Sequence, residues 1–163
     1  ILSSPGFLYS VKMGYLGTGV PFAIGAKLAA PGRPVCLISG DGALGFNLME
    51  METAARENLP IVVVAAVDDA WGMEKTAFKA MGFGAADWAG RGIEMAPIRY
   101  DGIAEKLGCH GEYVERLEDL APALQRAISS GRPALVHVKV DKELNTVPPG
   151  WEQFRSARNV RGY

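Results

Sequence analysis

The sequence has 163 residues, of which 48% are hydrophobic and 21% charged, and its formal net charge is −1. These values are ordinary for one globular domain, and they give no electrostatic reason to expect nucleic acid or an anionic membrane as a partner. No apolar run approaches the roughly 20 residues of a membrane span. The first residues contain no basic segment and no initiator methionine. We therefore expect a fragment or a processed chain of cytoplasmic location, without a signal peptide.

The chain alternates expected helices and strands. In chain order these are a helix over 21–30, a strand over 34–39, a helix over 44–57, a strand over 61–67, a helix over 101–107 capped by Asp101, a strand over 109–114, a helix over 117–129 and a strand over 134–140. The segment 61–67 (IVVVAAV) is continuously apolar, as expected for a strand covered on both faces. Short connections predict an α/β fold, three-layered and doubly wound, with a mostly parallel sheet of about five or six strands.

Two regions fit this pattern less well. Residues 73–97 are rich in glycine, alanine and aromatic residues, and their glycines break any long helix. Residues 145–163 contain prolines, aromatics and arginines. The sequence therefore predicts a domain over 1–144 and an extension or lid over 145–163. For the first region a mobile loop over a site and a plain surface loop both stay open. For the second, a segment that covers a ligand and a loosely docked tail stay open.

Residues 40–45, between a strand and a helix, have the pattern G-x-G-x-x-G. Asp68 ends the next expected strand, so on spacing alone this is a dinucleotide fingerprint, whose acidic residue lies about 20 residues further on and binds the ribose. Free amides and a helix dipole favour an anion at any such turn, however. The pattern by itself leaves the kind of diphosphate open.

Asp41 distinguishes the alternatives. In a metal-free dinucleotide site its carboxylate would face the phosphates and repel them. A carboxylate in a phosphate loop is useful when a cation lies between the two anions, because Mg²⁺ binds carboxylate, carbonyl and phosphate oxygens together. The carboxyl ends of neighbouring parallel strands share one edge of a sheet, so we expect Asp41 and Asp68 to converge on one ion. The sequence thus favours a metal-bridged diphosphate.

The turn and its flanking segments resemble a known family. Gly40-Asp41-Gly42, followed after a helix and a strand by an Asn-Asn-like position, is the thiamine diphosphate motif. Further segments continue the resemblance in order: 14–27 (GYLGTGVPFAIGAK), 49–54 (MEMETA), 59–64 (LPIVVV) and 71–73 (WGM). Over about residues 10–140 the chain is similar to the C-terminal, diphosphate-binding domain of the acetolactate synthase, benzaldehyde lyase and 2-hydroxyacyl-CoA lyase group.

The resemblance implies roles for individual residues. Asp41 and Asp68 match residues that bind the metal through their side chains in the family, and Ala70 matches a residue that binds it through the backbone carbonyl. Others match positions around the diphosphate: Gly40, Gly42, Ala43, Gly72 and Met73. Leu16 matches the apolar residue that holds the cofactor bent, and Gly14 the residue whose carbonyl meets the aminopyrimidine. Trp71 directly follows the expected metal ligand Ala70, and it is expected either to line the site or to pack on the sheet.

The sequence departs from the family pattern in two ways. The family usually has asparagine at the place of Asp68, and often at Val67. We expect a working site with a shifted metal preference or weaker cofactor binding. The glutamate that activates the aminopyrimidine in the family comes from a separate pyrimidine-binding domain, and neither Glu50 nor Glu52 is nominated for that role. The catalytic residue of this chain is therefore unknown, and another domain or subunit must supply the glutamate.

The resemblance implies a thiamine diphosphate- and Mg²⁺-dependent lyase or carboligase, a dimer or tetramer acting next to the carbonyl of a 2-oxo acid, aldehyde or acyl-CoA. The segment Trp71-Gly72-Met73-Glu74-Lys75 departs from the G-M-V stretch usual in acetolactate synthases, which slightly favours the lyase branch. Three alternatives stay open: a subunit of a two-chain 2-oxo acid decarboxylase, a non-catalytic cofactor-binding or assembly subunit, and, last, a metal-free dinucleotide oxidoreductase. His110 and His137 suggest neither a catalytic triad nor a zinc site. Cys36 and Cys109 are expected to be core thiols.

Overall fold

The structure, a computed structural model, describes residues 6, 15–84, 86 and 92–143. The chain forms two compact units, one of residues 1–67 and 97–140 and the other of residues 68–96 and 141–163. The expected extension over 145–163 lies outside the described residues, as does Gly14. Among the residues that are described, no helix has the length and apolar character needed to cross a bilayer.

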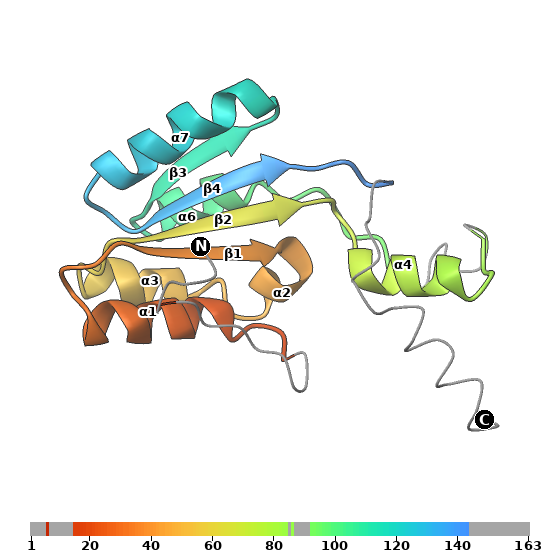
Figure 1. The fold of residues 1–163 in the computed structure, drawn as a ribbon, viewed down its shortest axis with the longest axis horizontal. Helices are drawn as coiled ribbons and strands as arrows, with labels where there is room; N and C mark the ends of the chain where they lie inside the picture. Colours follow the sequence, from red (N-terminus) through yellow and green to blue (C-terminus); the bar gives the residue numbers. More distant parts are fainter. Residues whose placement is uncertain (1–5, 7–14, 85, 87–91, 144–163) are drawn as a thin grey trace. The chain divides into compact units, whose positions relative to one another are not determined.

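The first unit is built on a parallel sheet in the order β1-β2-β4-β3 (Figure 1). Its strands are β1 (Val35–Gly40), β2 (Ile61–Val67), β3 (His110–Val114) and β4 (Ala134–Lys139). β2 pairs with both β1 and β4, so that Ile61 lies opposite Val35 and Val62 opposite Ala134. The parallel α/β class is confirmed, with four strands in the described residues against the five or six expected.

Five helices of this unit are described: α1 (Gly19–Ala29), α2 (Asp41–Gly45), α3 (Glu50–Arg56), α6 (Tyr100–Lys106) and α7 (Leu117–Ser129). Two apolar clusters form the core, one on each face of the sheet. The larger one joins α1, α2, α3 and α6 to the sheet, and the smaller one joins α7 to β2, β3 and β4. Figure 1 shows α7 apart from α1 and α3, with the sheet between them.

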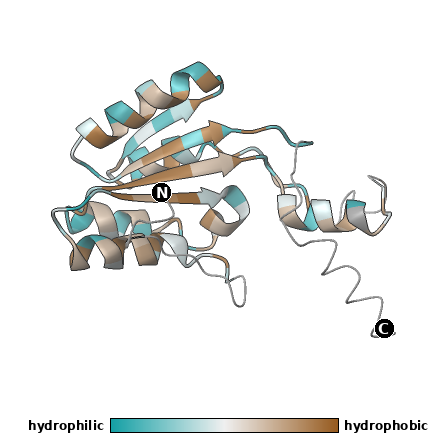
Figure 2. Cartoon of the chain, viewed as in Figure 1, coloured by the Kyte–Doolittle hydropathy of each residue, from teal (hydrophilic) through white to brown (hydrophobic). Residues whose placement is uncertain are grey.

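The composition of β2 explains its central place. Ile61, Val63 and Ala65 point into the larger cluster, while Val62 and Val64 pack in the smaller one. A strand covered on both faces needs apolar side chains at every position, and Figure 2 shows β2 hydrophobic along its length. The expected strand over 61–67 is therefore confirmed at both ends.

The expected helix over 44–57 is wrong as a single element. The structure has α2 and α3, joined by a turn in which the N–H groups of Asn47 and Glu50 bond the carbonyls three residues back, at 3.2 and 3.1 Å. The Asn47 side chain donates to the carbonyl of Gly17 at 2.9 Å. The turn thus docks on the segment before α1, a contact that helical spacing alone does not reveal. Past α3, Asn58 adopts a left-handed conformation with φ 52°, a conformation that commonly ends a helix.

The second unit contains α4 (Gly72–Ala80). The glycine-rich region was expected to lack a long helix, and α4 does stop before Gly82, whose φ of 87° favours glycine. In the loop that precedes α4 in sequence, Ala70 forms an antiparallel bridge with Glu94. This bridge joins the loop after β2 to the segment before α6.

Candidate functional site

The turn between β1 and α2 is made by Gly40 and Asp41. Gly40 ends β1 with extended backbone at φ −74° and ψ 157°, and Asp41 begins α2. Asp41 is only 2% exposed, and its Oδ1 accepts a hydrogen bond from the Gly42 N–H at 2.9 Å. A Cβ on Gly40 would meet nothing within 4 Å. The protein's own packing therefore does not require a glycine there, and a ligand can approach the bare backbone.

Gly42 and Ala43 lie in the first turn of α2. Backbone N–H groups in a first turn have no acceptor within their helix, so they are available to side chains or ligands. Here the Gly42 N–H bonds the Asp41 carboxylate. This bond keeps the Asp41 carboxylate beside the amides that we expected to meet a diphosphate.

The loop after β2 carries Asp68, Asp69 and Ala70. Asp68 is 7% exposed, and its Oδ1 accepts a hydrogen bond from the Ala70 N–H at 3.2 Å. Asp69 has φ 51°, a left-handed conformation that aspartate tolerates better than most residues do. Ala70 is buried. The loop therefore turns sharply between the two residues that match metal ligands.

The residues after this loop begin α4. Trp71 caps the helix and is half-buried, and its N–H donates to Ile93 O at 2.8 Å. Gly72 and Met73 form the first turn, where N–H groups again lack helical acceptors. The Met73 side chain is exposed, whereas the Gly72 carbonyl accepts a bond from the Thr76 hydroxyl at 2.9 Å.

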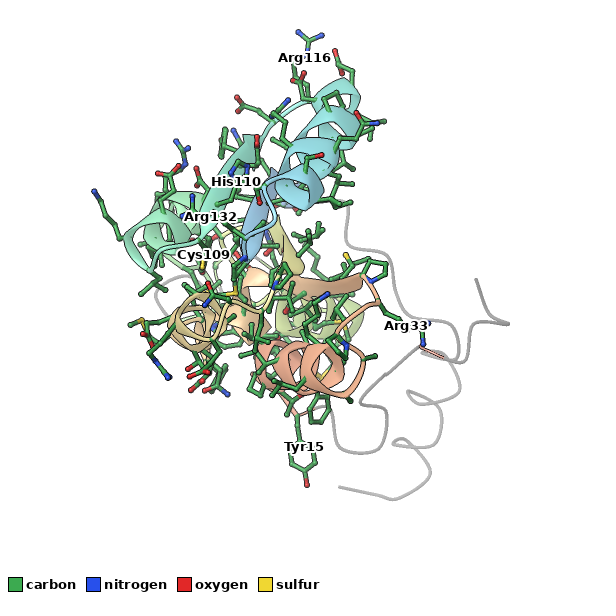
Figure 3. The ribbon with its side chains drawn as sticks, turned by 90° about the vertical axis from the view of Figure 1, so that its left-hand side faces the viewer. Tyr15, Arg33, Cys109, His110, Arg116 and Arg132 are labelled. Atoms are coloured by element: carbon green, nitrogen blue, oxygen red, sulfur yellow. The ribbon has the colours of Figure 1, made fainter. Side chains whose placement is uncertain are left out.

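Leu16 lies before α1 and is 45% exposed, so its apolar side chain is available for contact. Its neighbour Tyr15 also points away from the body of the first unit, as Figure 3 shows. Gly17 has φ 84°, and a Cβ there would lie 2.7 Å from the Phe46 Cβ. The glycine after Leu16 is therefore required by both backbone conformation and space.

The expected ligands offer oxygen atoms to a metal, the donor set that Mg²⁺ takes. A carboxylate as buried as those of Asp41 and Asp68 is costly unless donors or a cation compensate it. Among the described residues no group of three or more His, Cys, Asp and Glu side chains gathers. A metal here would therefore also need carbonyl or phosphate oxygens. Asp41 belongs to the first unit and Asp68 and Ala70 to the second, so their convergence on one ion stays a prediction.

The glutamates and histidines to which the sequence assigned no catalytic or metal-binding role have structural partners. Glu50 accepts a bond from the Thr53 hydroxyl at 2.9 Å, and Glu52 pairs with Arg56 at 3.3 Å on the same helix. His110 Nε2 lies 2.8 Å from Glu112 Oε1 on β3. His137 is 4% exposed on β4 and packs its ring against Tyr113.

The two cysteines differ. Cys109 is buried and its thiol donates to Met51 O at 3.4 Å, and burial raises the pKa of this thiol. Cys36 was also expected in the core but is exposed. The burial pattern of β1 alternates, and Cys36 and Ile38 point away from the larger cluster while Val35 and Leu37 pack on it. The apolar composition of a strand does not show which of its two faces is covered by other elements.

Sequence reasoning missed the residues that hold the loop after β2. Met95 N–H donates to Asp69 O at 2.8 Å, and Lys142 Nζ lies 3.0 Å from Asp69 Oδ2. Both partners are distant from the loop in sequence. No local spacing or motif marks them.

Comparison with known proteins agrees with these features. The family described as "Thiamine pyrophosphate enzyme, C-terminal TPP binding domain" matches residues 2–138. An acetolactate synthase large subunit of Mycobacterium tuberculosis is 44% identical over 136 residues, covering 83% of this chain and 24% of that protein. The 2-hydroxyacyl-CoA lyase 2 of Caenorhabditis elegans is 36% identical over 135 residues, covering 79% of this chain and 20% of the lyase. The chain thus spans about a quarter of the length of the curated relatives it matches.

Solved structures show the same fold. A thiamine diphosphate-dependent 4-hydroxybenzoylformate decarboxylase of Rhodococcus jostii superposes with a TM-score of 0.69 at 28% identity, over 77% of this chain and 23% of that one. The benzoylformate decarboxylase of Polynucleobacter necessarius gives 0.71 at 21% identity, over 83% and 25% of the two chains. At that identity the second comparison supports the fold alone.

Proposed function

The chain belongs to the C-terminal TPP-binding domain family of thiamine pyrophosphate enzymes, and we propose that it binds the diphosphate of thiamine diphosphate through Mg²⁺. The observation that carries this proposal is the buried Asp41 carboxylate, held beside the first-turn amides of α2 next to the bare backbone of Gly40. Asp41 would bind the metal, and the Ala43 amide would bind the diphosphate, joined by the Gly42 amide once the metal replaces its bond to Asp41.

The second half of the proposed metal site is the loop after β2. Asp68 would bind Mg²⁺ by its side chain and Ala70 by its carbonyl, with Trp71, Gly72 and Met73 on the other side of the diphosphate. Leu16 and Gly14 would meet the organic part of the cofactor. When bound, thiamine diphosphate supplies a carbon nucleophile that adds to carbonyl groups. The chain's own residues would position that group and keep its diphosphate neutralised.

The glutamate that activates the cofactor is proposed to come from a pyrimidine-binding domain or subunit, in a dimer or tetramer. The whole protein would then make or break a bond beside the carbonyl of a 2-oxo acid, an aldehyde or an acyl-CoA. The names of two relatives, an acetolactate synthase and a 2-hydroxyacyl-CoA lyase, support both a carboligase and a lyase reading. Mixing the chain with such a domain and measuring carboligation tests this step.

A non-catalytic cofactor-binding subunit is the second candidate, and the observation that favours it is Asp68 at the usual place of asparagine. An added carboxylate can strengthen metal binding and also repel the diphosphate. Cofactor binding without carboligation, whatever pyrimidine-binding domain is added, would support this candidate.

Calorimetry tests the binding itself. Thiamine diphosphate with MgCl₂ should bind, magnesium pyrophosphate should compete, and thiamine without phosphates should not. Asp41→Asn should weaken binding by about tenfold or more, because it removes a charged ligand. Asp119→Asn, which changes an exposed aspartate on α7, is the matched control and should bind normally. Asp68→Asn should bind at least as well as the natural chain, and weaker binding would show that its role is wrong. Binding of NAD or FAD without metal would contradict the proposal.

A further inference from the structure

Asp141, Lys142 and Glu143 come shortly after β4, and the last two are tied by their side chains to the rest of the second unit. We call all three residues the strap. The Glu143 N–H donates to Asp141 Oδ1 at 2.7 Å, which folds the strap on itself. The side chains of Lys142 and Glu143 then reach two different parts of the unit, the loop after β2 and α4.

Glu143 binds α4 through two lysines one helical turn apart. Its Oε1 lies 2.8 Å from Lys75 Nζ and its Oε2 2.6 Å from Lys79 Nζ. Lys75 is only 5% exposed, and its ammonium also donates to Lys142 O at 3.3 Å. A buried ammonium requires such partners. The two lysines lower the pKa of Glu143 to about 2, so the carboxylate stays charged near neutral pH.

Lys142 binds the loop after β2. Its Nζ lies 3.0 Å from Oδ2 of Asp69, the residue with φ 51° between Asp68 and Ala70. A left-handed conformation in a residue other than glycine persists where its surroundings hold it. The Asp69 carbonyl is held as well, by the Met95 N–H at 2.8 Å. Asp69 is therefore fixed through its side chain by the strap and through its backbone by the segment before α6.

We propose that Lys142 is a positioning residue for the loop after β2. It holds Asp69 in its left-handed conformation, so that Asp68 and Ala70 keep the arrangement required for metal and diphosphate. The inference rests on the proposed function of Asp68 and Ala70. Glu143 supports Lys142 by fixing the strap on α4. In this role Lys142 acts on the loop through its ion pair with Asp69.

A charge series at Lys142 tests this inference in the cofactor-free chain. Lys142→Arg keeps the ion pair, Lys142→Met removes it, and Lys142→Glu places a carboxylate against Asp69. Hydrogen exchange at the Trp71 and Met95 amides, which close the loop, should be normal in the first variant, faster by about two- to fivefold in the second and fastest in the third. Equal exchange in the Glu and natural chains would overturn the proposal.

Lys139→Met is the matched control. Lys139 and Lys142 are equally exposed, at 54% of the side chain, and Lys139 pairs with Glu115 at 2.6 Å in the first unit. Its loss should leave exchange at Trp71 and Met95 unchanged. If both methionine variants speed exchange there equally, the effect is general rather than positional, and the proposal fails.

Binding of thiamine diphosphate with MgCl₂ gives the second readout. The dissociation constant should rise along the same series, in step with exchange, while the midpoint of thermal unfolding stays close to that of Lys139→Met. Altered exchange with unaltered binding would overturn the positioning role. If the natural chain binds no cofactor, the proposed function fails, whereas the exchange series still decides whether Lys142 holds the loop. Asp69→Asn combined with Lys142→Met should add nothing to either single change if both act through one pair.

Discussion

Gly111 on β3 lies where α6 approaches the sheet most closely. A Cβ there would come within 2.6 Å of Asp101 O and 2.8 Å of Glu105 Cγ. Because the first of these atoms is backbone, α6 would have to move. We expect Gly111→Ala to lower the free energy of unfolding by about 1–3 kcal/mol, measured by urea titration.

Gly25 on α1 provides the control for that substitution. It is exposed within the helix, and a Cβ there would meet nothing within 4 Å. Gly25→Ala should raise the free energy of unfolding by up to about 1 kcal/mol, because alanine loses less backbone entropy in a helix. A Gly111→Ala chain as stable as the natural one would contradict the close approach of α6 to β3.

Single residues also show how far the site could be predicted from sequence. Asp41 and Asp68 were placed correctly, at the ends of β1 and β2, because a strand's end follows from its local apolar run. The ion pair and the backbone hydrogen bond that fix Asp69 could not be predicted from sequence, since Lys142 and Met95 come from distant parts of the chain. Local pattern finds the residues that would face a ligand, but not those that support them.

Among the elements, α7 depends on two small residues. Ala123 and Ala127 are both fully buried against β2, β3 and β4, one helical turn apart. Small side chains at this spacing let the helix lie close to the sheet. Ala127→Leu should therefore cost about 1–3 kcal/mol in the free energy of unfolding by overpacking. Ala121→Leu, at an exposed position of the same helix, should change it by less than about 0.5 kcal/mol. A tolerated leucine at Ala127 would mean that α7 packs loosely.

Elements with a strong local pattern were predicted well. The helix over 117–129 and the strand over 61–67 match α7 and β2 at both ends. The helix over 44–57 failed because the chain breaks at the turn whose Asn47 side chain bonds Gly17 O, a contact that forms only in the folded chain. Asp101 was expected to cap α6, but the helix begins at Tyr100 and Asp101 instead binds the Arg99 side chain. Periodicity predicts which residues face the core and does not predict the hydrogen bonds of their side chains.

For the molecule as a whole, acid stability depends on buried carboxylates that keep their charge. Asp101 is 6% exposed, and its two oxygens accept bonds from Arg99 at 2.9 and 2.6 Å. Burial raises the pKa of Asp101, but the hydrogen bonds and charge of Arg99 outweigh it and hold the pKa below the ordinary 3.8. His137 Nδ1, at 3.6 Å, acts in the same direction when it is protonated.

A carboxylate whose pKa is lower in the folded than in the unfolded chain stabilises the fold above the unfolded pKa, and that contribution is lost as the pH falls through the folded pKa. We expect Asp101→Asn to lower the free energy of unfolding by roughly 1 kcal/mol at pH 5, with the difference from the natural chain shrinking as the pH falls below about 4. Glu118→Gln is matched to it, since Glu118 also pairs with an arginine two residues earlier, at 2.7 Å, but its side chain is 59% exposed. An exposed pair contributes little, so this control should follow the natural chain at every pH. Urea unfolding followed by circular dichroism from pH 5 to pH 2 measures both differences, and a constant gap for Asp101→Asn would show that the pKa of Asp101 is not lowered in the fold.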